Sequence, residues 1–315
     1  MWRMPLAGES LPPLLIIVGA TAIGKTGLGI EIAEALNGEI VGADSRQIYK
    51  YMDIGTAKPT ETQQARVKHH LIDVVAPNEM LTLAAYQRQA YTTIDKMHKQ
   101  AKLPILVGGT GQYITAVEEG WSIPEVPPNY ELRDELEQEA ETIGAEAFHA
   151  KLMTIDSEAA EKIHPNNIRR VVRALEVFYE TGTPISDLQR KKAPPYRIRV
   201  IGLQMEREAL YERADLRVDM MMAEGFLDEV QQLLADGYSP TLPAMTALGY
   251  REMSQHLADQ LSLQDAIDQT KHSTHDFIRR QEIWFRGHDN GILWHNIDSI
   301  NVQDIIADVS QWMQE

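Results

Sequence analysis

The feature that most constrains the fold is LLIIVGATAIGKTGLGIEIAEAL, residues 14–36, where an apolar run leads through a glycine-rich turn into a helical pattern. The turn fits G-x-x-x-x-G-K-[ST], the P-loop pattern, in the strand-to-helix context that gives this pattern its mechanism. Glycines let backbone amides and a helix N-terminus face one anion. The residues expected to bind a di- or triphosphate are Gly19, Ala20, Thr21, Ala22, Ile23, Gly24, Lys25 and Thr26.

Two members of this turn carry chemistry in their side chains. Lys25 adds positive charge beside the phosphates, and the Thr26 hydroxyl is a ligand for Mg2+. The pattern alone does not make a nucleotide hydrolase, because several classes of enzyme hold a diphosphate in this way.

Further apolar runs alternate with helical patterns, as in GEIVGAD (38–44) and LPILVGGT (103–110). This alternation predicts βαβ units and a parallel sheet with helices on both faces. A Pro-rich break, WSIPEVPPNY, is followed by acidic and then basic helical patterns before a strand at 196–205. We therefore predict an α/β fold: a P-loop NTPase-like core from 1–120 and 196–315, with an all-helical insertion at 121–195. One continuous domain with a long helical excursion is the alternative.

The C-terminal part of the core is expected to be mostly helical. Residues 206–237 form a long helical pattern closed by Gly237, followed by a loop with Pro240 and Pro243. Two more helices and a short strand, GILWHNI (291–297), are predicted after it.

Composition excludes several classes of protein. Without Cys there are no disulfides and no Cys-ligated zinc, which suits a reducing compartment. No apolar run approaches the ~20 residues of a membrane span, and the first 13 residues lack the features of a secretion signal. The net charge of -16 argues against indiscriminate nucleic-acid binding. We expect a cytoplasmic protein that does not contact membranes.

Polar residues follow two of the predicted strands. Asp44 ends the second strand, and Gly108-Gly109-Thr110 ends the third. Ligands of parallel sheets lie beyond the carboxyl ends of the strands, so both should lie beside the P-loop. Asp44 is then a Mg2+ ligand, a proton acceptor, or simply a cap of the following turn. From spacing alone, this layout first indicates a small-molecule kinase.

Two stretches point away from a kinase. Residues 44–59, DSRQIYKYMDIGTAKP, are too rich in polar donors, Gly and Pro for a plain helix and are typical of a binding loop. From Lys162 to Arg199 there are nine positive residues, Arg190 among them, and three negative ones, so 9 - 3 = +6 within a chain of -16. Such a segment attracts a polyanion, unless it is only a solvated helix surface.

With these stretches the sequence resembles the bacterial tRNA dimethylallyltransferases, also called tRNA isopentenyltransferases. The resemblance extends over nearly the whole chain and is carried by GATAIGKT, DSRQIYKYMDIGTAKP, HHLIDV, VGGTGQYI, HPNNIRRVVRALE, MAEGFLDEV, ALGYRE and RRQEIWFR. It implies transfer of a dimethylallyl group from dimethylallyl diphosphate to N6 of adenosine 37, in tRNAs reading codons that begin with U. The P-loop then binds the diphosphate of this donor, and the insertion grips the anticodon stem-loop.

The resemblance assigns roles to individual residues. Asp44, Thr110 and Lys25 are the expected catalytic residues, with Asp44 accepting a proton from the adenine amine and Thr110 bonding a phosphate oxygen or Asp44. Arg213 and Arg217, four apart on one helical face, are expected to grip the diphosphate, or else to pair with acidic neighbours. The expected tRNA-binding residues are Asp44, Ser45, Arg46, Gln47, Thr110, Arg133, Arg169, Arg170, Arg173, Thr246, Gly249, Tyr250 and Arg251.

Some positions depart from the family pattern or allow a second interpretation. Ala20 stands where Pro is usual, Asn167 where Asp is common, and His275 where Arg is frequent. We expect His69 and His70 to be structural, and Trp284 and Phe285 to lie in the core and not to stack on RNA.

We predict a tRNA prenyltransferase that uses Mg2+. A P-loop small-molecule kinase and a non-catalytic RNA-binding module are the alternatives. The expected partners are the tRNA anticodon stem-loop and dimethylallyl diphosphate, with no obligate protein partner and a monomeric state.

Overall fold

The computed structural model describes residues 11–189, 191–288 and 291–315. Arg190 of the basic segment, and ten of the residues inspected for a secretion signal, lie outside these ranges. The chain divides into two compact units. We call Met1–Glu118 with Pro195–Glu315 the core unit, and Glu119–Pro194 the insertion unit.

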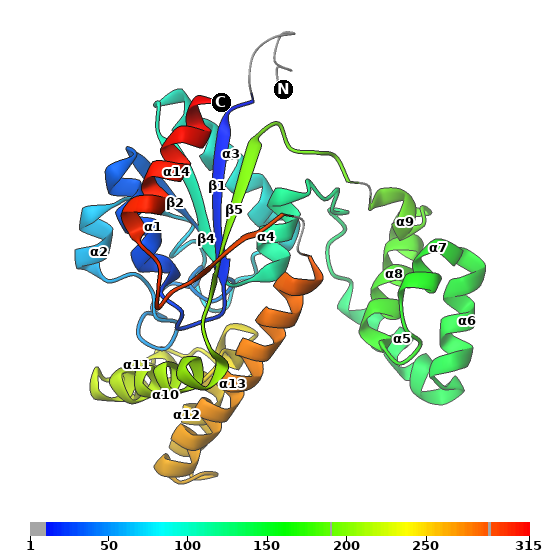
Figure 1. The fold of residues 1–315 in the computed structure, drawn as a ribbon. Helices are drawn as coiled ribbons and strands as arrows, with labels where there is room; N and C mark the ends of the chain where they lie inside the picture. Colours follow the sequence, from blue (N-terminus) through cyan, green and yellow to red (C-terminus); the bar gives the residue numbers. More distant parts are fainter. Residues whose placement is uncertain (1–10, 190, 289–290) are drawn as a thin grey trace. The chain divides into compact units, whose positions relative to one another are not determined.

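The core unit is built on a parallel sheet (Figure 1). Its strand order is β3-β2-β4-β1-β5-β6, and every neighbouring pair runs parallel. In β1, Leu14, Ile16 and Val18 face one hydrophobic cluster while Leu15 and Ile17 face the other. Burial on both faces is what a continuous apolar run indicates. The strands are β1 Pro13–Gly19, β2 Gly38–Ala43, β3 His69–His70, β4 Leu103–Gly108, β5 Arg197–Gln204 and β6 Leu293–Asn296.

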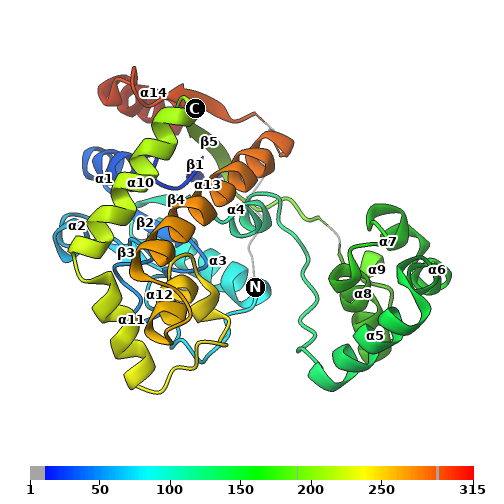
Figure 2. The same cartoon turned by 90° about the horizontal axis from the view of Figure 1, so that it is seen from below.

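Helices cover both faces of the sheet, which confirms the predicted α/β fold. α1 and α14 contribute to the cluster behind Leu15, and α3 and α4 to the cluster behind Leu14. Figures 1 and 2 show α10 to α13 beyond the carboxyl ends of the strands. The helices are α1 Lys25–Ala35, α2 Glu61–Arg66, α3 Leu83–Lys99, α4 Gly111–Glu118, α10 Arg207–Ala223, α11 Phe226–Ala235, α12 Tyr250–Leu257, α13 Leu263–Gly287 and α14 Val302–Gln314, with a 3-10 turn at Ala244–Thr246.

The structure differs from the helical predictions at two places. The pattern at 206–237 is two helices, because Gly225 adopts φ +99°, a left-handed conformation that ends α10 and starts α11. The C-terminal α14 was not predicted. Asn301 caps it by accepting a hydrogen bond from the Gln303 N–H, and Ile305, Val309 and Trp312 form its buried face.

The insertion unit has a core of its own. Phe148, Leu152, Val171 and Leu175 lie at its centre with no exposed surface. Within the described residues of either unit, no helix is long and apolar enough to cross a membrane. The helices of the insertion unit are α5 Tyr130–Ile143, α6 Ala145–Ile155, α7 Ser157–Lys162, α8 Ile168–Thr181 and α9 Ile185–Leu188.

Candidate active site

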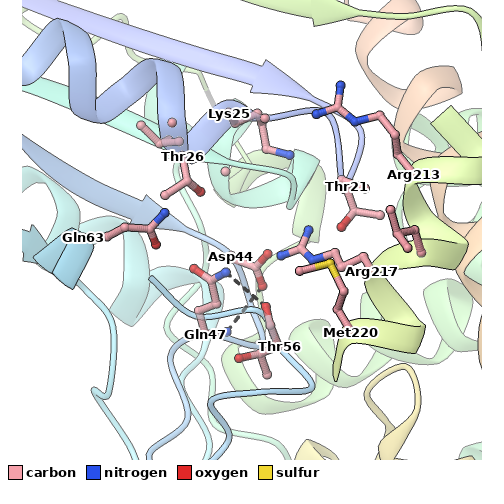
Figure 3. A pocket seen from close by; sticks show the side chains of 16 residues that line it. Thr21, Lys25, Thr26, Asp44, Gln47, Thr56, Gln63, Arg213, Arg217 and Met220 are labelled. Carbon is pink, nitrogen blue, oxygen red and sulfur yellow. Dashed lines mark hydrogen bonds between the residues drawn. The ribbon is translucent and has the colours of Figure 1, made fainter. Parts of the chain in front are cut away.

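A pocket of about 420 Å³ lies at the carboxyl ends of β1, β2 and β4, where parallel sheets bind ligands. Its size suits a small organic ligand. Figure 3 shows that its side chains come from the P-loop, the segment after β2 and helix α10. The lining residues are Thr21, Ala22, Gly24, Lys25, Thr26, Gly27, Asp44, Gln47, Thr56, Gln63, Val107, Gly108, Arg213, Leu216, Arg217 and Met220.

The P-loop curls because several of its residues have positive φ. Gly19 has φ +148°, Ala22 +64° and Gly24 +103°. A Cβ on Gly19 would lie 2.8 Å from the Leu203 carbonyl oxygen, so this close approach to β5 requires glycine. The side chains of Ala20 and Ile23 pack into the core and do not line the pocket, so these two residues and Gly19 can face an anion only through their backbone.

Lys25 is the cation at the bottom of the P-loop. Its Nζ donates a 2.7 Å hydrogen bond to the Ala20 carbonyl oxygen, which holds the amine inside the turn. Although part of the side chain remains accessible through the pocket, burial lowers the pKa of Lys25 to about 8; the negative charge of Asp44 opposes this and Arg217 adds to it. A bound anion would raise this pKa again, because a nearby negative charge favours the protonated amine.

Asp44 faces the same pocket and also caps a turn. Its Oδ1 accepts hydrogen bonds from the backbone N–H groups of Arg46 at 2.8 Å and Gln47 at 3.4 Å. Among the described residues, no hydrogen bond to Oδ2 is found. The capping role is therefore confined to one oxygen, and the other carboxylate oxygen can accept a proton or a hydrogen bond from a ligand.

One face of α10 closes the pocket. Arg213, Leu216, Arg217 and Met220 follow the i, i+3, i+4, i+7 spacing of a helical face, and all four line it. Burial lowers the pKa of Arg217, with the charges of Asp44 and Glu224 opposing the effect, yet a guanidinium stays protonated at neutral pH. Leu216 is 61% exposed and Met220 53%, so apolar surface lies directly beside the cationic groups.

Thr110 contacts Ser45 and not Asp44, which was one of its two predicted contacts. Its Oγ1 accepts a 2.9 Å hydrogen bond from the Ser45 N–H and lies 3.3 Å from the Ser45 hydroxyl. The side chain does not line the pocket, and its bond with Asp44 is not formed. The hydroxyl instead joins the β4–α4 turn to the segment after β2.

The loop after Asp44 is irregular, as its composition indicated. Gln47 lines the pocket, and its Nε2 donates to the Thr56 carbonyl oxygen at 3.2 Å (Figure 3) and to the Ala57 carbonyl oxygen at 3.0 Å. Arg46 points elsewhere, donating to the Pro243 carbonyl oxygen at 2.8 Å and to the Thr246 hydroxyl at 3.4 Å. The structure therefore brings Arg46 and Thr246, 200 residues apart, to one exposed edge.

Two of the expected tRNA contacts in the α12 region do not face solvent. Tyr250 has no exposed surface, and its hydroxyl donates to Glu229 Oε1 at 2.6 Å. Gly249 is buried against Phe226, which a Cβ would approach to 2.6 Å. Both residues pack the core because the chain turns inward after Ala247. Arg251 remains at the surface and pairs with Glu252.

The arginines of the insertion unit differ in their surroundings. The carboxylate of Glu176 has no exposed surface and accepts hydrogen bonds from Arg133 at 2.9 Å and from Arg173 at 2.6 Å. Arg133 and Arg173, two of the expected tRNA-binding residues, are thus held in a partly buried ion-pair cluster. Arg169 and Arg170, at the start of α8, are exposed.

The histidines and aromatic residues that we expected to be structural make contacts within the protein. His69 Nδ1 contacts the Val67 carbonyl oxygen, whereas His70 Nε2 contacts Glu39. Trp284 donates to the Thr115 hydroxyl at 3.1 Å, and Phe285 is 3% exposed. Near the middle of α13, His275 hydrogen-bonds Asp215 at 2.8 Å and stacks on Tyr211.

Sequence reasoning missed several lining residues, namely Gly27, Thr56, Gln63, Val107, Leu216 and Met220. Leu216 and Met220 could have been found, because they share the helical spacing of Arg213 and Arg217. Gln281 was also missed. It does not line the pocket but hydrogen-bonds the P-loop from α13.

The fold and the pocket define a P-loop α/β enzyme in which an anion cradle faces a carboxylate. The IPP transferase family model matches residues 47–288, and the chain belongs to this family, that of the tRNA dimethylallyltransferases. It is 55% identical to the tRNA dimethylallyltransferase of Herpetosiphon aurantiacus over 87% of each chain. It is 49% identical to the enzyme of that name from a Roseiflexus species, over 96% of this chain and 99% of the relative.

Solved structures show the same similarity. A full-length tRNA isopentenylpyrophosphate transferase from Bacillus halodurans is 38% identical with a TM-score of 0.72, over 96% of this chain and 97% of that one. A eukaryotic dimethylallyltransferase acting on tRNA is 26% identical with a TM-score of 0.81, over 96% of this chain and 80% of that one.

Proposed function

We propose that the protein transfers a dimethylallyl group from dimethylallyl diphosphate to N6 of adenosine 37, in tRNAs that read codons beginning with U. The products are N6-isopentenyladenosine and diphosphate. One observation carries the proposal: a single pocket combines an anion cradle, exposed apolar side chains and a carboxylate. Membership of the family supports it.

The donor is held by groups of complementary chemistry. The P-loop amides, Lys25, Arg213 and Arg217 face the diphosphate, and Leu216 and Met220 offer apolar surface for the five-carbon tail. As the bond between the allylic carbon and the diphosphate oxygen breaks, negative charge grows on the diphosphate. Fixed cations stabilise this charge more than that of the intact donor, which lowers the barrier.

The acceptor amine needs help, because its lone pair is delocalised into the adenine ring. Asp44 accepts the N6 proton as the bond between N6 and the allylic carbon forms, and the departing diphosphate keeps the electron pair of the broken bond. The free Oδ2 of Asp44 is the oxygen suited to this step.

The residues present also fit a magnesium ion. Thr26 lines the pocket with a hydroxyl, and Mg2+ commonly takes one or two protein oxygens and completes its shell with phosphate oxygens and water. When bound, Mg2+ would neutralise part of the diphosphate charge.

The RNA is recognised by exposed and partly buried groups of both units. The segment Asp44–Gln47 with Thr246 and Arg251 forms the part in the core unit, and Arg169 and Arg170 the part in the insertion unit. The target base must leave the loop stack to reach the pocket, at a cost of a few kcal/mol. We propose that the enzyme acts in the cytoplasm as a monomer.

The experiment is incubation of the protein with an unmodified anticodon stem-loop, dimethylallyl diphosphate and Mg2+, followed by mass spectrometry of the RNA. Addition of C5H8 at adenosine 37 is the expected result. Phosphoryl transfer from ATP to a small molecule, with unchanged RNA, would establish the kinase alternative. RNA binding with no chemical change to either substrate would establish the binding module.

A further inference from the structure

A buried glutamine on α13 joins two loops of the active site. Gln281 Oε1 accepts a 2.8 Å hydrogen bond from the Thr21 N–H, in the P-loop, and Gln281 Nε2 donates a 2.8 Å hydrogen bond to the Gly109 carbonyl oxygen. The side chain is only 5% exposed, so both ends of its amide need partners within the protein. Gln281 is 260 residues from Thr21 and 172 residues from Gly109 in the sequence, so the two bonds join distant parts of the chain.

The neighbouring glycine makes this contact possible. A Cβ on Gly109 would lie 2.3 Å from Gln281 Nε2 and 3.6 Å from Lys25 Nζ. A side chain at 109 would therefore displace the amide, and the amide lies close to the P-loop lysine.

The connection continues from Gly109 to Asp44. The next residue, Thr110, donates its N–H to the Ala43 carbonyl oxygen at 3.1 Å and accepts the Ser45 N–H on Oγ1 at 2.9 Å. Thr110 is thus bonded to the residues on both sides of Asp44. One chain of hydrogen bonds runs from the Thr21 amide through Gln281, Gly109 and Thr110 to the backbone that carries Asp44.

We propose that Gln281 is a positioning residue that fixes the distance between the diphosphate cradle and the Asp44 carboxylate, acting through Gly109 and Thr110. The inference rests on the proposed function for its two substrates. Each loop binds its own substrate, but transfer requires a fixed distance between the P-loop and the Asp44 carboxylate. Small misplacement of reacting groups slows a reaction strongly. Gln281 should therefore affect the chemical step more than either binding step.

The test compares Gln281→Met with Gln264→Met, a matched change at an exposed glutamine near the start of the same helix. Gln281→Met is expected to lower single-turnover transfer to the anticodon stem-loop about tenfold or more. The separately measured Kd values for dimethylallyl diphosphate and for the stem-loop should change less than about threefold. Retained transfer, or affinities that fall in proportion to the rate, would overturn the proposal.

A double-mutant cycle with Thr110→Val separates positioning from general destabilisation. Because the two residues belong to one chain, the double variant should be no slower than the slower single variant; multiplied effects would contradict the proposal. Thr110→Ser, which retains the hydroxyl, should restore the rate. If Gln281→Met does not fold, Thr110→Val against Thr110→Ser tests the same chain, and equal rates for these two overturn it.

A second readout keeps this inference apart from the proposed function. If the wild type and Gln264→Met add no C5H8 to RNA, the proposed function fails, and the connection is then measured with inorganic diphosphate alone. Diphosphate should slow amide hydrogen exchange at residues 44–47 in the wild type but not in Gln281→Met. Equal protection in both proteins would show that Gln281 does not connect the loops.

Discussion

The ammonium group of Lys25 titrates near neutral pH, which makes donor binding depend on pH. With a pKa of about 8 in the free protein, Lys25 loses its proton as the pH rises through 8, whereas a bound diphosphate keeps it protonated. The Kd for dimethylallyl diphosphate should therefore rise about tenfold between pH 7 and pH 9. Isothermal titration calorimetry measures this. Lys25→Arg, which stays charged, should show a flat profile, and a flat wild-type profile would contradict the assignment.

Asp44 caps a turn, and we propose that it also accepts the proton of the adenine amine; Asp44→Asn separates these two roles. The asparagine Oδ1 can still accept the Arg46 N–H, so the melting temperature should change little. Without a proton acceptor, kcat should fall about 100-fold or more. Transfer kinetics give kcat, and calorimetry on the same samples gives the melting temperature. A variant that keeps wild-type kcat would rule out proton transfer to Asp44.

At the residue scale, sequence reasoning succeeded where the determinants are contiguous. The P-loop residues follow one another in the chain, so their spacing alone indicates the cradle that Lys25 and Thr26 line. The partner of Thr110 could not be predicted, because Asp44 and Ser45 are adjacent and only the folded turn decides which one the hydroxyl reaches. Gln281 meets Thr21 only after the whole core unit has formed.

The junction of the P-loop with α1 depends on backbone conformation more than on space. Gly24 has φ +103°, although a Cβ there would meet no atom closer than 3.9 Å. Gly24→Ala should therefore lower the free energy of unfolding by about 1–2 kcal/mol through strain alone. Gly27, inside α1 with no neighbour within 4 Å, is the control: Gly27→Ala should be neutral or stabilising by up to about 1 kcal/mol. Urea unfolding measures both, and equal losses would contradict this account.

Helix α8 is attached to α5 by the Glu176 cluster, which makes the insertion unit sensitive to acid. Burial by itself raises the pKa of Glu176, but hydrogen bonds from Arg133, Arg173 and the Asn129 N–H outweigh it and lower the pKa below the ordinary 4.5. This stabilisation is complete above pH 4.5 and is lost as the pH falls through the lowered value. Glu176→Gln should cost about 1–3 kcal/mol at pH 7 and remove this pH dependence. Hydrogen exchange in α5 and α8 reports it; an unchanged acid profile would exclude the cluster as the cause.

At the scale of elements, the strands were easier to predict than the helix boundaries. A run such as LLIIV can be buried on both faces only in the middle of a parallel sheet. The break at Gly225 was missed because the apolar pattern continues through it, and only the backbone of Gly225 differs. The α14 helix was missed because its apolar face depends on packing against α1 for its stability.

For the molecule as a whole, the structure separates exposed arginines, which we propose bind RNA, from arginines that hold the insertion unit together. Replacing exposed Arg169 and Arg170 together by Ala should weaken binding of the anticodon stem-loop and reduce the slope of log Kd against log salt by about 1–2, with unchanged stability. Arg173→Ala should instead lower stability, since it breaks a contact with buried Glu176. Fluorescence anisotropy across a salt series measures the slope. An unchanged slope would show that α8 does not contribute to RNA binding.

In the proposed reaction, the P-loop holds a diphosphate that departs from the dimethylallyl group. The most direct measurement supplies dimethylallyl diphosphate and ATP together with an anticodon stem-loop, then follows phosphorus NMR and RNA mass in one sample. We predict one inorganic diphosphate released for each C5H8 gained by the RNA, with ATP intact. Consumption of ATP to ADP, with the prenyl donor and the RNA unchanged, would contradict the account.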